Sequence, residues 1–252
     1  MPSSLVVRSN GWLQFLKKGW SKQGGLVEAF VDAFARTAVF EHLSLLSVGG
    51  AAAKPRGTTQ AIKTAFKAAK SRCALLEGGK TIHSEDTTAF IELEISPIGA
   101  DITTAVRGDV LTELGAKALD DFFTLFTSLH DNLEGAAHVV CATAWTSWDD
   151  NAPESGGSSD WPLRRIADVL EPKRPQADED DVFWEAAQAI TKGKPPAGVT
   201  RSTHGGLVML RWTTDPRDAR AANAAALKHE QWVKAHVKNE PAPSDSRVYI
   251  PD

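Results

Sequence analysis

Cysteine, tyrosine and long apolar runs are all scarce in this sequence of 252 residues. Its two cysteines, Cys73 and Cys141, form no CxxC pair and offer no disulfide framework, which indicates a reducing compartment. No stretch approaches the roughly 20 apolar residues that a membrane span needs. The first twenty residues lack the apolar run and cleavage site of a secretory signal. These absences predict a cytoplasmic protein without a membrane segment.

Phosphate-binding and zinc motifs are incomplete wherever they begin. The GGKT stretch at 78–81 ends like a phosphate-binding loop, but Ala74 stands where that loop needs its first glycine. His229 and Glu230 begin a zinc-helix motif whose second ligand position is Val233. We therefore predict no metal site and no cofactor.

Nucleophilic and nucleic-acid-binding patterns are equally incomplete. A strand is expected at 138–145, so His138 and Cys141 should leave opposite faces, and the acids that follow disfavour a thiolate. No GxSxG elbow supplies a serine nucleophile. The basic stripe Lys63, Lys67 and Lys70 has no interleaved aromatics, so we read it as a solvated helix face. These patterns predict no catalytic residue and no nucleic-acid partner.

Charge is distributed unevenly along the chain. The net charge is −4 overall, with −1 in residues 1–146, −7 in 147–190 and +4 in 191–252. The central acidic stretch would repel a phosphate backbone and attract a basic partner.

Hydrophobic periodicity predicts an α+β fold. The clearest signal is a single amphipathic helix from about 110 to 133, started by Asp109. Residues 88–106 alternate as a hairpin around a turn that contains Pro97 and Gly99. The other expected elements are a short strand at 5–7, helices from 26 and from Thr58, strands at 38–48, 138–145 and 206–214, a helix at 182–190, and a last helix with Asp215 as cap and Pro216 at its first position.

This order of elements predicts mixed or antiparallel sheets covered by helices, in two lobes. The expected parts are an N-terminal α+β lobe at 1–146, an irregular acidic region at 147–177, a helix-strand-helix unit at 178–238 that packs on the same or a second sheet, and a loosely attached tail at 239–252.

The stretch CATAWTSWDD joins the strand at 138–145 to the acidic region. We expect Val139, Cys141 and Thr143 to share a buried face, with aromatics and acids beyond the strand as the rim of a partner-binding surface. An equally weighted alternative is that Trp148 covers the core and the acids keep a long loop soluble. The predicted binding residues are Trp145, Trp148, Asp149, Asp150, Glu154, Asp178, Glu179, Asp180 and Asp181.

The segment GGLVMLRWTTDPRDARAANAAALKHEQW resembles the ending of bacterial polymorphic-toxin immunity proteins, specifically immunity protein 52 and its type VI relatives. That ending has a glycine pair, an apolar strand, a Thr-Asp-Pro-like turn and a final helix. Here Gly205-Gly206, the strand to Thr213 and Thr214-Asp215-Pro216 take those places. The preceding hairpin, long helix and HVVCATAW are similar in order to the middle of those proteins.

The resemblance implies a cytoplasmic protein that binds and neutralises a cognate toxin without catalysis. The acidic stretch suggests that this toxin domain has a basic surface. Two other classes stay open from the sequence: a small hydrolase or transferase with a site near the acidic loop, and a structural or adaptor subunit of a secretion or phage assembly.

Overall fold

The computed structural model describes residues 5–16, 25–42, 45–48, 54–55, 80–83, 89–96, 98–147, 164–171 and 193–236. The strands in these ranges are β1 (Val6–Phe15), β2 (Leu45–Val48), β3 (Lys54–Pro55), β4 (Lys80–His83), β5 (Ala89–Ile95), β6 (Gly99–Arg107), β7 (Ala137–Ser147), β8 (Arg164–Leu170), β9 (Thr200–His204) and β10 (Leu207–Arg211). The helices are α1 (Gly25–Phe34), the 3-10 helix η2 (Ala38–His42), α3 (Gly108–Leu114), α4 (Lys117–Asn132) and α6 (Ala219–His236).

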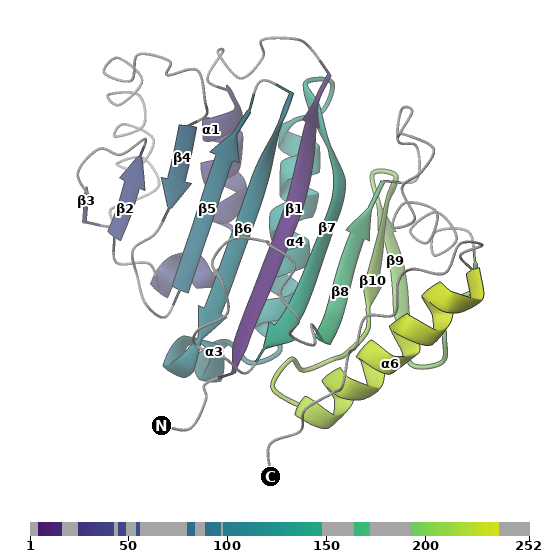
Figure 1. The fold of residues 1–252 in the computed structure, drawn as a ribbon. Coiled ribbons are helices and arrows are strands. Elements are labelled where there is room, and N and C mark those ends of the chain that lie inside the picture. Colours follow the sequence, from purple (N-terminus) through teal and green to yellow (C-terminus); the bar gives the residue numbers. More distant parts are fainter. Residues whose placement is uncertain are drawn as a thin grey trace.

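The ten described strands form one sheet in the order β3-β2-β4-β5-β6-β1-β7-β8-β10-β9 (Figure 1). Every neighbouring pair for which a register is known, such as β1 with β6 and β10 with β9, is antiparallel. The α+β fold with antiparallel strands is therefore confirmed. Two lobes are not confirmed, because β8, β10 and β9 extend the same sheet that the earlier strands begin.

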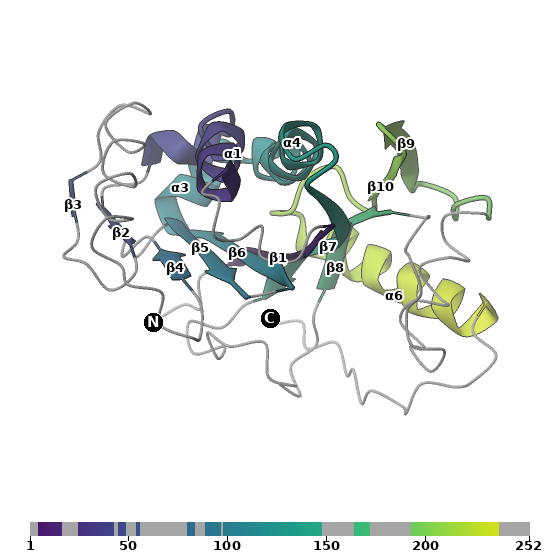
Figure 2. The ribbon, with the colours of Figure 1, turned by 90° about the horizontal axis from the view of Figure 1, so that it is seen from above.

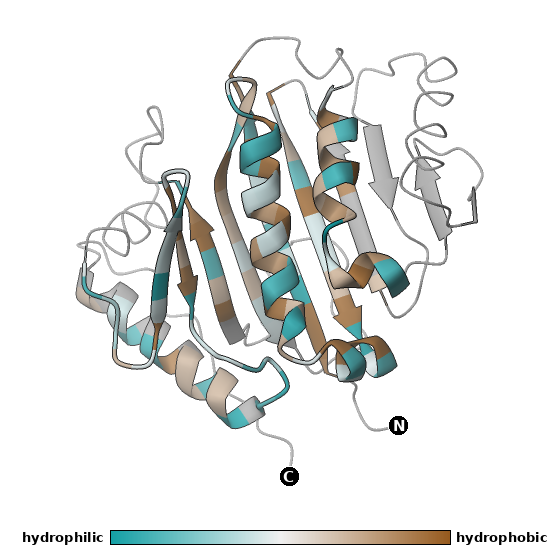
Figure 3. Cartoon of the chain, turned by 180° about the vertical axis from the view of Figure 1, so that it is seen from behind, coloured by the Kyte–Doolittle hydropathy of each residue, from teal (hydrophilic) through white to brown (hydrophobic). Residues whose placement is uncertain are grey.

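Helices cover the two faces of this sheet unequally. Figure 2 shows α1, α3 and α4 on one face and α6 on the other, near β8 and β10. The larger core lies under α1 and α4, whereas a smaller cluster lies under α6 and includes Val140, Leu210 and Trp212. Viewed from the α4 side in Figure 3, polar residues mark the outward surface of that helix. No helix of the described ranges is long and apolar enough to cross a membrane.

The helix expected from about 110 to 133 is in fact two helices. Gly115 has φ +55 and ψ −126, a conformation that ends α3 and that residues with a Cβ avoid. Asp109 lies in the first turn of α3, but the cap position is Arg107, which makes no capping bond through its side chain. The apolar stripe still continues across the break, because α4 buries Leu119, Phe126 and Leu129.

A close approach holds α4 on the centre of the sheet. Gly11 of β1 lies under Phe126, and a Cβ built on Gly11 would overlap the phenyl ring and lie 2.9 Å from the Cβ of Ala142. Phe126 is fully buried and stacks edge-on against Phe122 at 5.2 Å between ring centroids. Glycine at this position therefore lets a large aromatic side chain reach the strand backbone.

The stretch 38–48, expected as one strand, begins with η2 and only then enters β2. The reason is Asp121 of α4, whose carboxylate accepts the backbone N–H groups of Ala38 at 2.7 Å and Val39 at 2.8 Å. This carboxylate satisfies N–H groups that would otherwise have no partner at the start of η2. Burial raises the pKa of Asp121, and the two backbone hydrogen bonds oppose that rise.

Three other expectations need correction at element boundaries. The irregular region predicted at 147–177 contains β8, of which Ile166 to Leu170 are fully buried. The short strand expected at 5–7 runs on to Phe15. The last helix begins at Ala219, because Asp218 rather than Asp215 accepts a first-turn N–H, that of Ala221 at 3.0 Å. The helices expected from Thr58 and at 182–190, and the tail from 239, lie outside the described residues.

Candidate partner-binding site

Trp145 is the only member of the predicted binding surface within the described ranges. It is half-buried near the end of β7, and its register partners are Arg8 in β1 and Arg165 in β8. The remaining predicted residues lie outside the described residues: Trp148, Asp149, Asp150, Glu154, Asp178, Glu179, Asp180 and Asp181. The acidic rim around the tryptophans therefore stays a prediction.

Cys141 and Thr143 share a face of β7 as predicted, but Val139 does not, because the strand is irregular between them. The pairing of β7 with β1 shifts between Trp12 and Leu13, so that Val140 is an extra residue in the ladder. Such a bulge reverses the side of the sheet on which the following residues lie. Val139 packs in the larger core under α4, whereas Cys141 packs against the smaller cluster under α6.

The same bulge brings His138 and Cys141, expected on opposite faces, to one face of the sheet. Their register partners Gln14 and Trp12 are two residues apart in β1 and so point the same way. His138 Nδ1 also lies 3.5 Å from Glu171 Oε2, and both side chains are mostly buried. Among the described side chains, no group of three or more His, Cys, Asp or Glu residues is arranged to hold a metal ion.

A buried carboxylate fixes the strands under α6. Asp168 of β8 is 1% exposed and accepts a hydrogen bond from Trp212 Nε1 at 2.6 Å and from Thr143 Oγ1 at 3.1 Å. Trp212 also packs against Trp232 of α6, with ring centroids 6.2 Å apart. These contacts tie β7, β8 and the end of β10 to the same helix.

The β9–β10 hairpin turns at the glycine pair. Gly205 and Gly206 have φ +55 and φ +99, and His204 pairs with Leu207, so the two glycines form a two-residue turn of type I′. The sequence predicts only the second strand of this hairpin. A Gly-Gly pair between two strand-like segments favours a hairpin. The first segment here, TRSTH, lacks the apolar alternation that predicts a strand.

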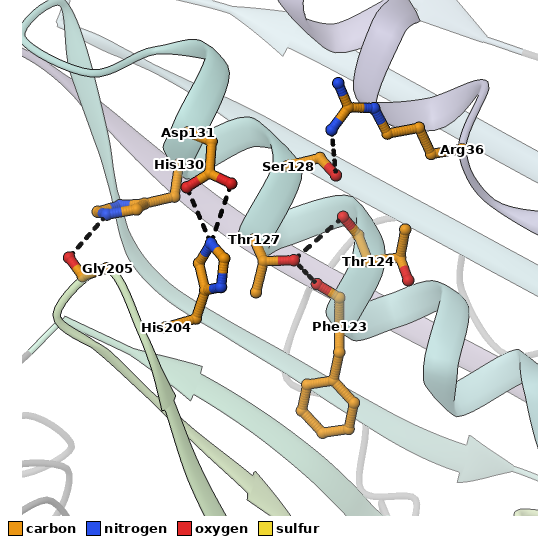
Figure 4. A network of polar contacts seen from close by, with 9 residues as sticks. All are labelled: Arg36, Phe123, Thr124, Thr127, Ser128, His130, Asp131, His204 and Gly205. Carbon is orange, nitrogen blue, oxygen red and sulfur yellow. Dashed lines mark hydrogen bonds and ion pairs between the residues drawn. The ribbon is translucent and has the colours of Figure 1, made fainter.

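Two histidine contacts hold this hairpin against the end of α4 (Figure 4). His204 Nε2 lies 2.9 Å from both carboxylate oxygens of Asp131, and His130 Nε2 lies 2.9 Å from the carbonyl oxygen of Gly205. Gly205 also fits closely, since a Cβ there would lie 2.7 Å from His130 Nε2. The hairpin tip is therefore docked on α4 by two neighbouring residues.

A third contact holds the other end of the hairpin. Arg211 of β10 forms an ion pair with Asp120 of α4, and its guanidinium lies 5.0 Å from the ring centroid of Phe123. A cation over an aromatic ring adds an attraction that a simple surface ion pair lacks. Side chains of α4 thus contact β10 at Arg211 and β9 at His204, and these two contacts fix the position of the hairpin.

The side chains of β9, the first strand of the hairpin, are mostly exposed. Thr200, Arg201, Ser202 and Thr203 are exposed and His204 is half-buried, in contrast to β10, in which Leu207, Val208 and Leu210 are buried. A polar, exposed edge strand on a rigid support can bind another chain through its backbone and its side chains together.

Comparison with known proteins adds little to this geometry. No family model matches the chain, and no curated protein matches it. One solved structure, the Pseudomonas aeruginosa T6SS protein PA0821, is 11% identical over 91% of this chain and 83% of its own, with a TM-score of 0.48. A likeness of this size carries no argument about function.

Proposed function

We propose that this protein is an immunity protein that binds a cognate bacterial toxin and neutralises it by protein–protein interaction, without catalysis. The observation that carries the proposal is the hairpin-helix unit of β9, β10 and α6. The resemblance to type VI immunity proteins rests on its sequence, and its glycine pair and Thr-Asp-Pro segment form the two turns that connect the unit.

The second of these turns is ordered by its own side chains. Asp215 accepts the backbone N–H of Arg217 at 2.9 Å, and the Arg217 guanidinium lowers the pKa of the Asp215 carboxyl through its hydrogen bonds. Arg217 Nη1 also donates to the carbonyl oxygen of Thr112 at 3.3 Å. This contact ties the turn that precedes the last helix to α3.

A rigid surface favours recognition of a protein. Groups that are already fixed in the unbound chain lose little further freedom on binding, so more of the contact energy appears as affinity. The hairpin meets this condition through Asp120, Asp131 and His130 of α4. A complex that covers about 800 Å² of each partner would be enough to exclude substrate from a toxin's active site.

The test is to search the neighbouring reading frame for a large secreted protein with a toxic C-terminal domain, and then to co-express that domain with this protein. We expect growth to be restored, the two chains to co-elute, and toxin activity to fall in proportion to the immunity protein added. Inactivation at far below one equivalent would instead identify an enzyme. Self-association into large particles without toxin, together with no protection, would identify an assembly subunit.

The predicted surface of tryptophans and acids needs a separate test. Apart from Trp145, its residues lie outside the described part of the chain. Trp148→Ala and the double variant Asp149→Asn/Asp150→Asn should each weaken toxin binding by about 1 kcal/mol or more while the free energy of unfolding stays unchanged. A matched control is Asp109→Asn, in an exposed carboxylate of α3. Unchanged affinity in both test variants would reject this surface without rejecting toxin binding itself.

A further inference from the structure

β9 forms one end of the described strand order. It pairs with β10 on one side, and no described strand follows it on the other. Its residues are exposed on both faces of the sheet, apart from the half-buried His204. Exposed sheet edges of this kind are the sites at which proteins add a strand from a partner.

The register of the hairpin determines which backbone groups point outward. In a hairpin with a two-residue turn, the residues that flank the turn form a hydrogen-bonded pair, which here is His204 with Leu207. Hydrogen-bonded and non-hydrogen-bonded pairs alternate along an antiparallel ladder, and Thr203 with Val208 is the next pair. The N–H and C=O of Thr203 are therefore directed away from β10, toward the sheet edge.

This edge is held in an extended shape before any partner arrives. Asp131 holds His204 at one end of β9, and Arg201 Nη1 donates to the carbonyl oxygen of Gly193 at 3.2 Å near the other. Lys228 of α6 donates to the carbonyl oxygen of Ala197 at 2.9 Å, which fixes the loop that leads into the strand. An ordered edge can add a strand without a further loss of backbone freedom.

The loop end of β9 is basic, whereas Asp131 lies beside His204 at the hairpin end. No acidic residue occurs between Glu185 and Asp215 in the sequence. Lys194, Arg201 and Lys228 are all exposed, and the hydrogen bonds to Gly193 and Ala197 bring the loop and α6 alongside β9. A partner segment that carries acidic side chains would complement this charge and be steered toward the edge.

We infer that β9 accepts an acidic, extended segment of the toxin, which pairs with the backbone of Thr203 and lengthens the sheet by one strand. The inference rests on the proposed immunity function and names the surface through which it acts. The segment contributes backbone hydrogen bonds at the edge, and its carboxylates face Lys194 and Arg201. This site is separate from the predicted acidic surface near Trp145.

The decisive comparison is between two substitutions at Thr203. Thr203→Pro removes the outward N–H, and proline is tolerated on edge strands because no ladder bond is lost. Thr203→Ala removes only the side chain and retains the N–H. We expect toxin binding, measured by calorimetry, to weaken about tenfold or more in Thr203→Pro and less than about threefold in Thr203→Ala. Equal affinities in two folded variants would overturn the inference.

Charge reversal gives an independent readout. Lys194→Glu should weaken binding mainly by slowing association, and the loss should shrink at high salt. Arg220→Glu is the matched control, because Arg220 is exposed on the first turn of α6, eight residues before Lys228. An equal effect of the two reversals would show that net charge, and not the edge of β9, attracts the toxin.

Amide hydrogen exchange separates the inference from the proposed function. On toxin binding, the Thr203 amide should become protected, while the Ser202 amide, directed toward β10, should change little. A wild-type protein that neither binds nor neutralises the toxin rejects the immunity function, and this site with it. A toxin complex without protection at Thr203 rejects the edge alone. A toxin-free dimer that Thr203→Pro dissociates would assign the edge to a second copy.

Discussion

Replacement of Asp168 by alanine should strongly destabilise the α6 side of the fold. The side chain is 1% exposed and accepts hydrogen bonds from the Trp212 indole at 2.6 Å and the Thr143 hydroxyl at 3.1 Å. Alanine would leave the buried Trp212 indole and the half-buried Thr143 hydroxyl without this acceptor. A donor buried without a partner costs about 1–3 kcal/mol, so we expect the free energy of unfolding to fall by roughly 3 kcal/mol or more.

A double-mutant cycle with Trp212→Phe isolates the hydrogen bond from the loss of packing. Trp212→Phe alone leaves a buried carboxylate oxygen without its indole donor, and we expect it to cost about 2 kcal/mol. Once Asp168 is alanine, Trp212→Phe no longer breaks that bond, so the coupling energy should be about 1.5–3 kcal/mol. Urea unfolding followed by far-ultraviolet circular dichroism measures all four proteins.

Asp168→Asn is the control for shape. Its amide oxygen can accept from Trp212 while its NH₂ group donates to the Thr143 oxygen, so a smaller loss of about 1 kcal/mol is expected. Additivity of the Asp168→Ala and Trp212→Phe effects within about 0.5 kcal/mol would refute the reasoning. It would show that the buried carboxylate contributes nothing specific to holding β8 and β10 together.

Three further outcomes test other parts of the fold by the same unfolding measurements. Gly11→Ala should cost about 1–3 kcal/mol because a Cβ overlaps the ring of Phe126, and the double variant Gly11→Ala/Phe126→Leu should be more stable than additivity predicts. Burial raises the pKa of Asp121 above its ordinary value of 3.8, so the folded chain holds this proton more tightly than the unfolded chain. The difference in free energy of unfolding between the wild type and Asp121→Asn should therefore shift against the wild type as the pH rises from 3.8 through the raised pKa. The same pH dependence in both proteins would contradict this. Asp131→Ala should change the free energy of unfolding by less than about 1 kcal/mol, because its ion pair with His204 is exposed, while amide exchange in β9 becomes faster; unchanged exchange would contradict the docking role.

Side-chain periodicity predicted the parts of the fold in which one face is buried and the other is polar. The alternation at 88–95 placed β5, and the apolar run at 207–210 placed β10. The three- and four-residue spacing of Ala118, Phe122, Leu125 and Leu129 likewise identified a buried side of α4. Burial of one face leaves a repeating pattern in sequence, and that pattern is what such reasoning detects.

The errors lie where tertiary contacts override the local pattern. A distant carboxylate, Asp121, caps residues 38 and 39 and makes a 3-10 helix from a segment with strand composition. The bulge at Val140 depends on the register with β1 and leaves no mark in the β7 sequence, so the faces of His138 and Cys141 could not be assigned. β8 was not predicted because it stands between two stretches of loop composition.

The candidate site was only partly accessible to the same reasoning. Aromatic and acidic composition predicts a partner-binding surface at Trp145 and in the region beyond it. That surface stays a prediction. The docked hairpin was not predicted, because its first strand is polar. In addition, Arg211 contacts Asp120, and His204 contacts Asp131, only in the folded chain. Ion pairs between residues about 70 to 90 positions apart leave no sequence pattern when a single sequence is read alone.

The position of β1 in the middle of the sheet sets an order for folding during synthesis. Residues 6–15 are made well before both of their neighbours in the sheet, β6 and β7. At about 5–20 residues per second, roughly 7–26 s separate the synthesis of Phe15 from that of Ser147. Until then one edge of β1 lacks its partner β7, and the contact of Gly11 with Phe126 and Ala142 is incomplete. We therefore expect the nascent chain to cover only one edge of β1, through β6, during this interval.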